Sequence, residues 1–250
     1  MEANNRSKPL FSTALAIIVL TMAALTSTSS SVGLQTQGNS SNKRQRIPDL
    51  ERWPVANYDA SLPTDSVQRG KRQAKNKKCD KSDWPIVVND IADSTVRLHQ
   101  INPDLPAFPV RQSTLIVIGR IVSASAYLSN DKTGVYSEFD VVVEEVLKND
   151  IAEKPLVGLS IGVTREGGRI LFPSGRVHWY GIAKQSMPRS GGRYVLFLTG
   201  EEEETLTILT GYELVTGKVL PLDDLSNPNK YLDADEGTFL NSLRASISNP

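Results

Sequence analysis

The alternation of hydrophobic and polar positions is clearest between Val135 and Lys148. Such alternation is typical of a β-strand with one face on a core and the other in water. It breaks at Val142 and Glu145, which predicts a β-bulge or a bend. The core face is expected to carry Val135, Ser137, Phe139, Val141, Val143 and Leu147, and the water face Tyr136, Glu138, Asp140 and Glu144.

Shorter apolar runs recur about every ten residues, with glycine-rich turns between them. Gly119 lies inside the first run and predicts a bulge of the kind that barrels use at corners. The run from Arg193 to Thr199 is nearly continuous, which indicates a central strand buried on both faces. The expected strands cover 115–125, 135–148, 159–165, 170–172, 176–182, 193–199, 205–210, 212–215 and 218–220.

This spacing predicts a mainly β fold, a small antiparallel OB-like barrel or sandwich. Asp235 is a helix start signal, and Phe239, Leu240, Leu243 and Ile247 fall on one face of the C-terminal helix that follows. A short helix is also expected between Trp84 and Ile101. We expect an N-terminal apolar helix and a disordered linker before the barrel.

Residues 1–31 have the order of an export signal. Arg6 and Lys8 precede an apolar run from Leu10 to Leu25, and small polar residues follow it. The run is shorter than the roughly 20 residues that a spanning helix prefers, so we expect a cleaved signal peptide, with a retained membrane anchor as the alternative. Either outcome leaves the rest of the chain exported, as a periplasmic, cell-surface or secreted protein.

Residues 32–83 are polar, with few apolar side chains, and we interpret them as a disordered basic linker. Its positive charge could attract an anionic surface or only keep the tether extended. Cys79 is the only cysteine, so no intramolecular disulfide forms, and the neighbouring lysines would lower its thiol pKa. Residues 84–250 form the predicted β-barrel domain with flanking helices.

Three motifs carry a resemblance. They are Ile116-Val-Ile-Gly-Arg120, then Val143-Glu-Glu-Val-Leu-Lys148, then Gly191-Gly-Arg-Tyr-Val-Leu-Phe-Leu198. This pattern resembles exported bacterial proteins of unknown function. It is also similar to the OB-like barrel of netrin-type and metalloproteinase-inhibitor modules, although this chain lacks the cysteines that staple them. The resemblance implies a fold rather than an activity.

The sequence contains no recognised catalytic, metal-binding or cofactor-binding motif. No serine stands in a nucleophile-elbow pattern, and the two Gly-Gly-Arg turns lack the helix that a phosphate loop requires. Glu144 and Glu145 are adjacent on a strand and face opposite ways, so they cannot flank one bond. We therefore predict no catalytic residue, no cofactor and no metal.

One strand offers a candidate ligand-binding face. Arg176, His178 and Tyr180 share one side of it, and Val177 and Trp179 share the other. If His178 and Tyr180 are exposed, they form a platform of rings and charge for a sugar, a peptide or a polyanion. If the strand is central, the same side chains pack in the core.

These observations favour an exported, non-enzymatic domain that binds a ligand or takes part in envelope assembly. Its partner would be an envelope protein, a glycan or an anionic surface, and the membrane itself if the leader is uncleaved. The alternative is a secreted or periplasmic hydrolase with its site around His178. The C-terminal half, from Thr114 on, has a negative excess of five charges, so we expect no nucleic acid.

Overall fold

A computed structural model describes residues 50–80, 96–99, 105–152, 155–182, 184–200, 206–225 and 227–249. All of them belong to the unit Arg44–Pro250. The apolar run at 10–25, most of the predicted helix at 84–101 and the acidic tip at 201–204 lie outside the described residues. Of the helix prediction only residues 96–99 can be compared, and they form a strand.

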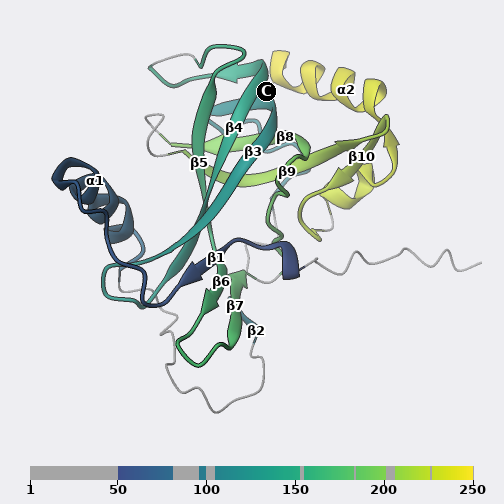
Figure 1. The fold of residues 1–250 in the computed structure, drawn as a ribbon. Coiled ribbons are helices and arrows are strands. Elements are labelled where there is room, and N and C mark those ends of the chain that lie inside the picture. Colours follow the sequence, from purple (N-terminus) through teal and green to yellow (C-terminus); the bar gives the residue numbers. More distant parts are fainter. Residues whose placement is uncertain are drawn as a thin grey trace, which may run out of the picture. The chain divides into compact units, whose positions relative to one another are not determined.

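Five strands close into a barrel, with β3 and β4 as its longest members (Figure 1). Hydrogen-bonded pairs run in the order β3-β4-β5-β9-β8, and β8 pairs again with β3. All neighbours are antiparallel except β5 and β9. This is the strand order of an OB-type barrel, so the predicted fold class is confirmed. The strands are β3 (Leu115–Leu128), β4 (Val135–Asn149), β5 (Ser160–Glu166), β8 (Arg193–Thr199) and β9 (Thr207–Val215).

One bulge falls beside the predicted break at Glu145, whereas Val142, the other predicted break, pairs regularly with Arg120. The register of β3 against β4 shifts between Ile118 and Gly119, which leaves Glu144 of β4 without an opposite residue. A Cβ at Gly119 would lie 2.6 Å from Val141 Cγ1 and 2.8 Å from the Val142 carbonyl oxygen. Only glycine lets the two strands approach this closely at the bend.

Two hydrophobic clusters lie on opposite sides of β8, which confirms that this strand is buried on both faces. The inner cluster fills the barrel with side chains such as Phe139, Val163 and Leu196. The outer cluster is covered by α2 (Glu236–Ser248), which contributes Phe239, Leu240 and Leu243. The Asp235 carboxylate caps α2 by accepting from the Thr238 backbone N–H at 2.9 Å, as the start signal predicts.

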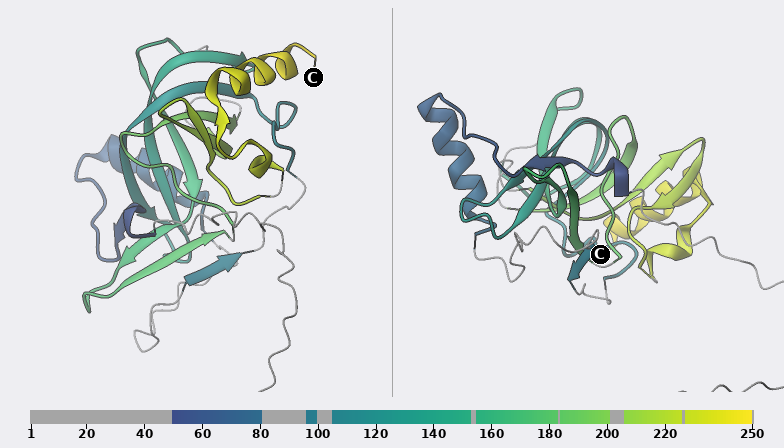
Figure 2. Two further views of the ribbon diagram at one scale, coloured as in Figure 1. Left: turned by 90° about the vertical axis from the view of Figure 1, so that its right-hand side faces the viewer. Right: turned by 60° about the horizontal axis from the view of Figure 1, so that its bottom comes forward.

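Short elements join the barrel to α2. They are β10 (Lys218–Pro221), the 3-10 helix η3 (Pro228–Tyr231) and β11 (Ala234–Asp235). β10 extends the sheet from β9, and β11 pairs with β10. Figure 2 shows α2 beside the ends of β3 and β4, where Arg244 forms an ion pair with Glu145 at 3.0 Å.

A second sheet has the order β1-β6-β7-β2. It contains β1 (Val55–Asn57), β6 (Gly168–Leu171), β7 (Val177–Ile182) and β2 (Val96–His99). The outer strands β1 and β2 run parallel to their neighbours, and the β6–β7 hairpin is antiparallel.

Residues 50–80 require a correction to the linker prediction, because they are ordered. They form the 3-10 helix η1 (Leu50–Arg52), β1 and α1 (Ser66–Lys77). Trp53 and Ala56 are buried, so a few apolar side chains anchor a polar segment. α1 also covers Tyr136, which is 3% exposed although the alternation placed it in water.

Candidate anion-binding site

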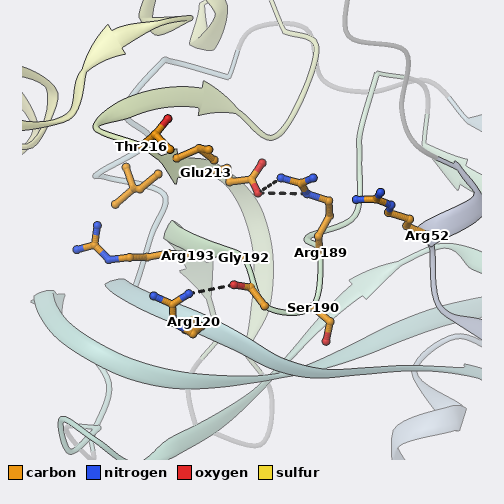
Figure 3. A pocket seen from close by; sticks show the side chains of 11 residues that line it. Arg52, Arg120, Arg189, Ser190, Gly192, Arg193, Glu213 and Thr216 are labelled. Atoms are coloured by element: carbon orange, nitrogen blue, oxygen red, sulfur yellow. Dashed lines mark hydrogen bonds and ion pairs between the residues drawn. The ribbon is translucent and has the colours of Figure 1, made fainter.

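Four arginines surround one open pocket of about 690 Å³, which we call the arginine cleft. They come from η1, from β3, from the loop before β8 and from the first residue of β8. Figure 3 shows Arg189 turned toward Glu213, with Arg52 beyond it, while Arg120 and Arg193 line the other side. The remaining lining residues are Ser190, Gly191, Gly192, Leu214, Val215 and Thr216.

A glycine turn places two of the arginines. Gly191 has a φ of 80°, a conformation that favours glycine, and its backbone N–H donates to the Ile121 carbonyl at 2.7 Å. The Gly192 N–H donates to the Arg189 carbonyl at 3.0 Å and closes the turn. The turn is thereby tied to β3, and Arg189 and Arg193 emerge from its two ends into the same cleft.

Arg120 and Arg193 stand directly opposite each other on β3 and β8. Like charges in such a pair repel, so an acid is needed nearby. Glu144 supplies it, because its carboxylate accepts from Arg193 Nε at 2.5 Å and lies 3.7 Å from Arg120 Nη2. Glu144 is the bulged residue of β4, so the bulge that bends the strand also aims this carboxylate at the arginine pair.

The other contacts hold each guanidinium in place. Arg189 forms a short ion pair with the buried Glu213, and Arg193 donates to Glu236 at 2.6 Å. Arg120 donates to the Gly191 carbonyl at 3.0 Å. The hydrogen bonds to Glu213 raise the pKa of Arg189. Partial burial lowers the pKa of Arg193, but its bonds to Glu144 and Glu236 outweigh burial and raise it, so both stay charged.

Arginines outnumber acids in the lining of the cleft, which carries four arginines and one glutamate, and Glu144 and Glu236 pair with the arginines from beside it. Arg120 is the most exposed of the three paired arginines, with half of its side chain in water. Arg52 is exposed at the rim. An anion entering the cleft would therefore meet fixed guanidinium groups with accessible N–H donors.

Besides the arginines and Glu213, the polar side chains of the lining are hydroxyls. Ser190 and Thr216 are the hydroxyl-bearing residues of the lining, and no histidine stands beside them. Among the residues that the structure describes, no group of three or more His, Cys, Asp and Glu is placed to hold a metal ion.

The residues predicted from sequence lie elsewhere. His178 and Tyr180 are 5% and 2% exposed, and the His178 ring packs edge-on against Phe172 at 5.0 Å. The condition for an exposed platform is therefore not met, because this face of β7 lies against the core. Arg176 is exposed at the turn before β7, and Trp179 is half-buried on the opposite face.

Cys79 also requires a correction. The sequence places lysines around it and predicts a lowered thiol pKa, but burial and the charges of Glu166 and Asp80 raise this pKa to about 11. The thiol is protonated at neutral pH and is a poor nucleophile there.

The sequence contains one signal for the arginine cleft. Arg120 and Arg193 both follow glycines in the motifs that carry the resemblance. Their pairing across β3 and β8 becomes visible only once the strand register is known, and Arg52 lies more than sixty residues earlier in the chain.

No protein-family model matches the chain, and a comparison with curated proteins finds no relative. Within the part of the chain that the structure describes, none of the helices has the length and apolar character needed to cross a membrane.

Proposed function

We propose that this protein is an exported, non-enzymatic binding domain whose arginine cleft holds an anionic group of an envelope glycan or another envelope component. The observation that carries the proposal is the convergence on one pocket of four arginines from η1, β3, the loop before β8 and β8 itself. Planar guanidinium groups match carboxylate, sulfate and phosphate oxygens in a way that lysines do not.

The existing ion pairs support binding without a large rearrangement. Arg189 and Arg193 are held by Glu213, Glu144 and Glu236, so their side chains lose little freedom when a ligand arrives. The carboxylates of Glu213 and Glu144 also reduce the repulsion between the arginines of the cleft. An oxyanion would add contacts chiefly to Arg120, which has half of its side chain in water.

The alternative, a hydrolase centred on His178, has less support. A general base must come within hydrogen-bond reach of a substrate proton, and His178 is buried against Phe172. The raised pKa values of Arg189 and Arg193 keep these two side chains protonated, so they can stabilise charge but cannot accept protons.

Isothermal titration of the full chain with a sulfated polysaccharide, a polyuronate and inorganic phosphate tests the proposal. Arg120→Ala should weaken binding of the best anion by at least roughly tenfold, because it removes a charge-assisted contact of about 1.5–3 kcal/mol. Affinity should also fall as salt is raised, since the contacts are ionic and half-exposed.

Arg176→Ala is the matched control, because Arg176 is an exposed arginine outside the cleft and belongs to the face predicted from sequence. The proposal is overturned if Arg120→Ala leaves anion affinity unchanged or if Arg176→Ala lowers it equally. Tighter binding of a single-stranded oligonucleotide than of any polysaccharide would replace the glycan with nucleic acid as the ligand.

A further inference from the structure

Helix α1 and the residue after it concentrate positive charge. Residues 66–78 contain six cationic side chains and no acid. The two acids that flank this segment are held by backbone N–H groups, since Asp65 accepts from Gln68 at 2.8 Å and Asp80 accepts from Asn130 at 2.7 Å. From sequence, the charge either attracts an anionic surface or keeps a tether extended. Because the segment is a helix, the second explanation does not hold for it.

Three of the six cations are bound to other parts of the protein. Arg72 pairs with Glu138 through both terminal nitrogens, at 2.8 and 3.1 Å, and Lys75 Nζ lies 3.4 Å from the same carboxylate. Arg69 donates to the carbonyls of residues 63 and 64, at 3.0 and 2.8 Å. These contacts join one side of α1 to the β3–β4 hairpin and to the chain that precedes the helix.

The other three cations, Lys71, Lys77 and Lys78, are exposed. Val67, Lys71, Ala74 and Lys78 are spaced by four, three and four residues, so they form one stripe along the helix. All four are exposed, and Val67 is 66% exposed. Lys77 lies beside the stripe, and we call these five residues the lysine face. Figure 1 shows α1 along the outside of the barrel.

The stability of the helix explains only part of the lysine face. Cations at the C-terminal end of a helix interact favourably with its dipole, which accounts for Lys77 and Lys78. Lys71 lies in the middle of α1, where the dipole has little effect on it. Val67 lies in the first turn and contributes little buried apolar area to the fold. A partner that combines negative charge with an apolar layer would engage both of these residues.

We propose that the lysine face docks α1 lengthwise on an anionic lipid surface. Lysine ammonium groups are compact point charges on flexible stems, which suits a surface whose negative headgroups move laterally. The Val67 and Ala74 side chains, in the same stripe, would enter the headgroup layer. A polysaccharide or a nucleic acid in water offers no such layer, and the export expected from residues 1–31 also favours a membrane. The inference goes beyond the proposed function and does not use the arginine cleft.

Sedimentation of the full chain with lipid vesicles tests the proposal. One set of vesicles consists of phosphatidylcholine, and the other is an equimolar mixture of phosphatidylcholine and phosphatidylglycerol. The chain should partition more strongly to the anionic vesicles at low salt, and the difference should shrink as salt is raised. The apolar run at 10–25 is the same in every variant, so its contribution cancels when variants are compared.

The variant that tests the lysine face combines Lys71→Gln, Lys77→Gln and Lys78→Gln. It should lower the partition coefficient for the anionic vesicles by roughly fivefold for each lysine removed. Partition to the phosphatidylcholine vesicles should change little, because these vesicles carry no net charge.

The matched control combines Arg176→Gln, Lys184→Gln and Lys218→Gln, which removes the same charge from exposed positions outside α1. This control should keep most of the partition of the unaltered chain. Val67→Trp should raise partition to the anionic vesicles, because an indole is favourable at a membrane interface. A purely structural role of the lysine face would produce neither difference.

Arg120→Ala disables the arginine cleft and should leave vesicle partition unchanged, so failure of the cleft and failure of the lysine face are distinguishable. The proposal is overturned if the full chain partitions equally to both kinds of vesicle at low salt, or if the lysine variant and its control lose the same amount. It is also overturned if Arg120→Ala removes the preference for anionic vesicles. Lysine-dependent binding to a polyuronate that exceeds binding to the anionic vesicles would replace the lipid with an anionic glycan.

Discussion

Arg165 and Asp223 form an ion pair in which the two side chains are 1% and 0% exposed. Asp223 also accepts from the Thr210 hydroxyl and the Ser186 backbone N–H, at 2.8 and 3.0 Å. Arg165 Nε and Nη1 have no partner among the described residues. Asp223→Ala would leave a buried charge uncompensated and should lower the free energy of unfolding by about 3–5 kcal/mol, measured by urea denaturation.

The exposed pair of Arg244 and Glu145 is the matched control, and Glu145→Ala should cost at most about 1 kcal/mol. Replacing Arg165 and Asp223 together by Met and Leu should recover most of the stability lost in Asp223→Ala, because no charge is then left buried. Equal losses for Asp223→Ala and Glu145→Ala would mean that burial does not govern the strength of the pair.

The raised thiol pKa of Cys79 predicts how its alkylation rate depends on pH. A raised pKa means that the thiol stays protonated until the pH approaches about 11, and only the thiolate reacts with iodoacetamide. The alkylation rate of the folded protein should therefore keep rising through pH 10. In denaturant the rate should level off at lower pH, near the ordinary thiol value. A plateau below pH 9 in the folded protein would contradict the burial of Cys79.

At the scale of elements, the sequence predicted what depends on local pattern. Alternation identified β4 with its buried Val135, Phe139 and Val141, the bulge followed from Gly119, and Asp235 marked the start of α2. It did not predict the packing of residues 50–80, which depends on partners far along the chain. The arginine cleft was missed for the same reason, since strand register decides which arginines meet.

The helix α1 shows how such a polar segment becomes ordered. Arg72 stacks its guanidinium 3.4 Å above the Tyr127 ring and binds Glu138 with both terminal nitrogens. Arg72→Ala should remove both contacts, so hydrogen exchange in residues 66–77 should accelerate roughly tenfold or more while exchange in β8 changes little.

Lys77→Ala is the control for α1, because Lys77 is in the same helix and exposed. It should leave exchange throughout α1 nearly unchanged. Equal acceleration of exchange in α1 and β8 after Arg72→Ala would show that helix and barrel unfold as one unit, contrary to this expectation.

At the scale of the whole molecule, the boundary predicted at residues 83 and 84 can be tested against the contacts of the preceding segment. Trp53 is 4% exposed and belongs to the main hydrophobic cluster, and a Cβ at Gly181 would lie 2.7 Å from its ring. β1 pairs with β6, and Arg169 Nε donates to the Trp53 carbonyl at 2.7 Å. A fragment of residues 84–250 lacks Trp53 and β1 and would therefore expose the residues that they cover.

We therefore expect the fragment 84–250 to be less stable than the fragment 44–250 by at least about 3 kcal/mol, because the loss of a buried tryptophan alone costs about 3–5 kcal/mol. Urea unfolding of both fragments measures the difference, and Trp53→Ala in the longer one should account for much of it. Val55→Ala, at a position 40% exposed at the start of β1, should cost far less. Equal unfolding midpoints for the two fragments would contradict this expectation. They would support the boundary predicted at residues 83 and 84 and would show that residues 50–80 do not stabilise the barrel.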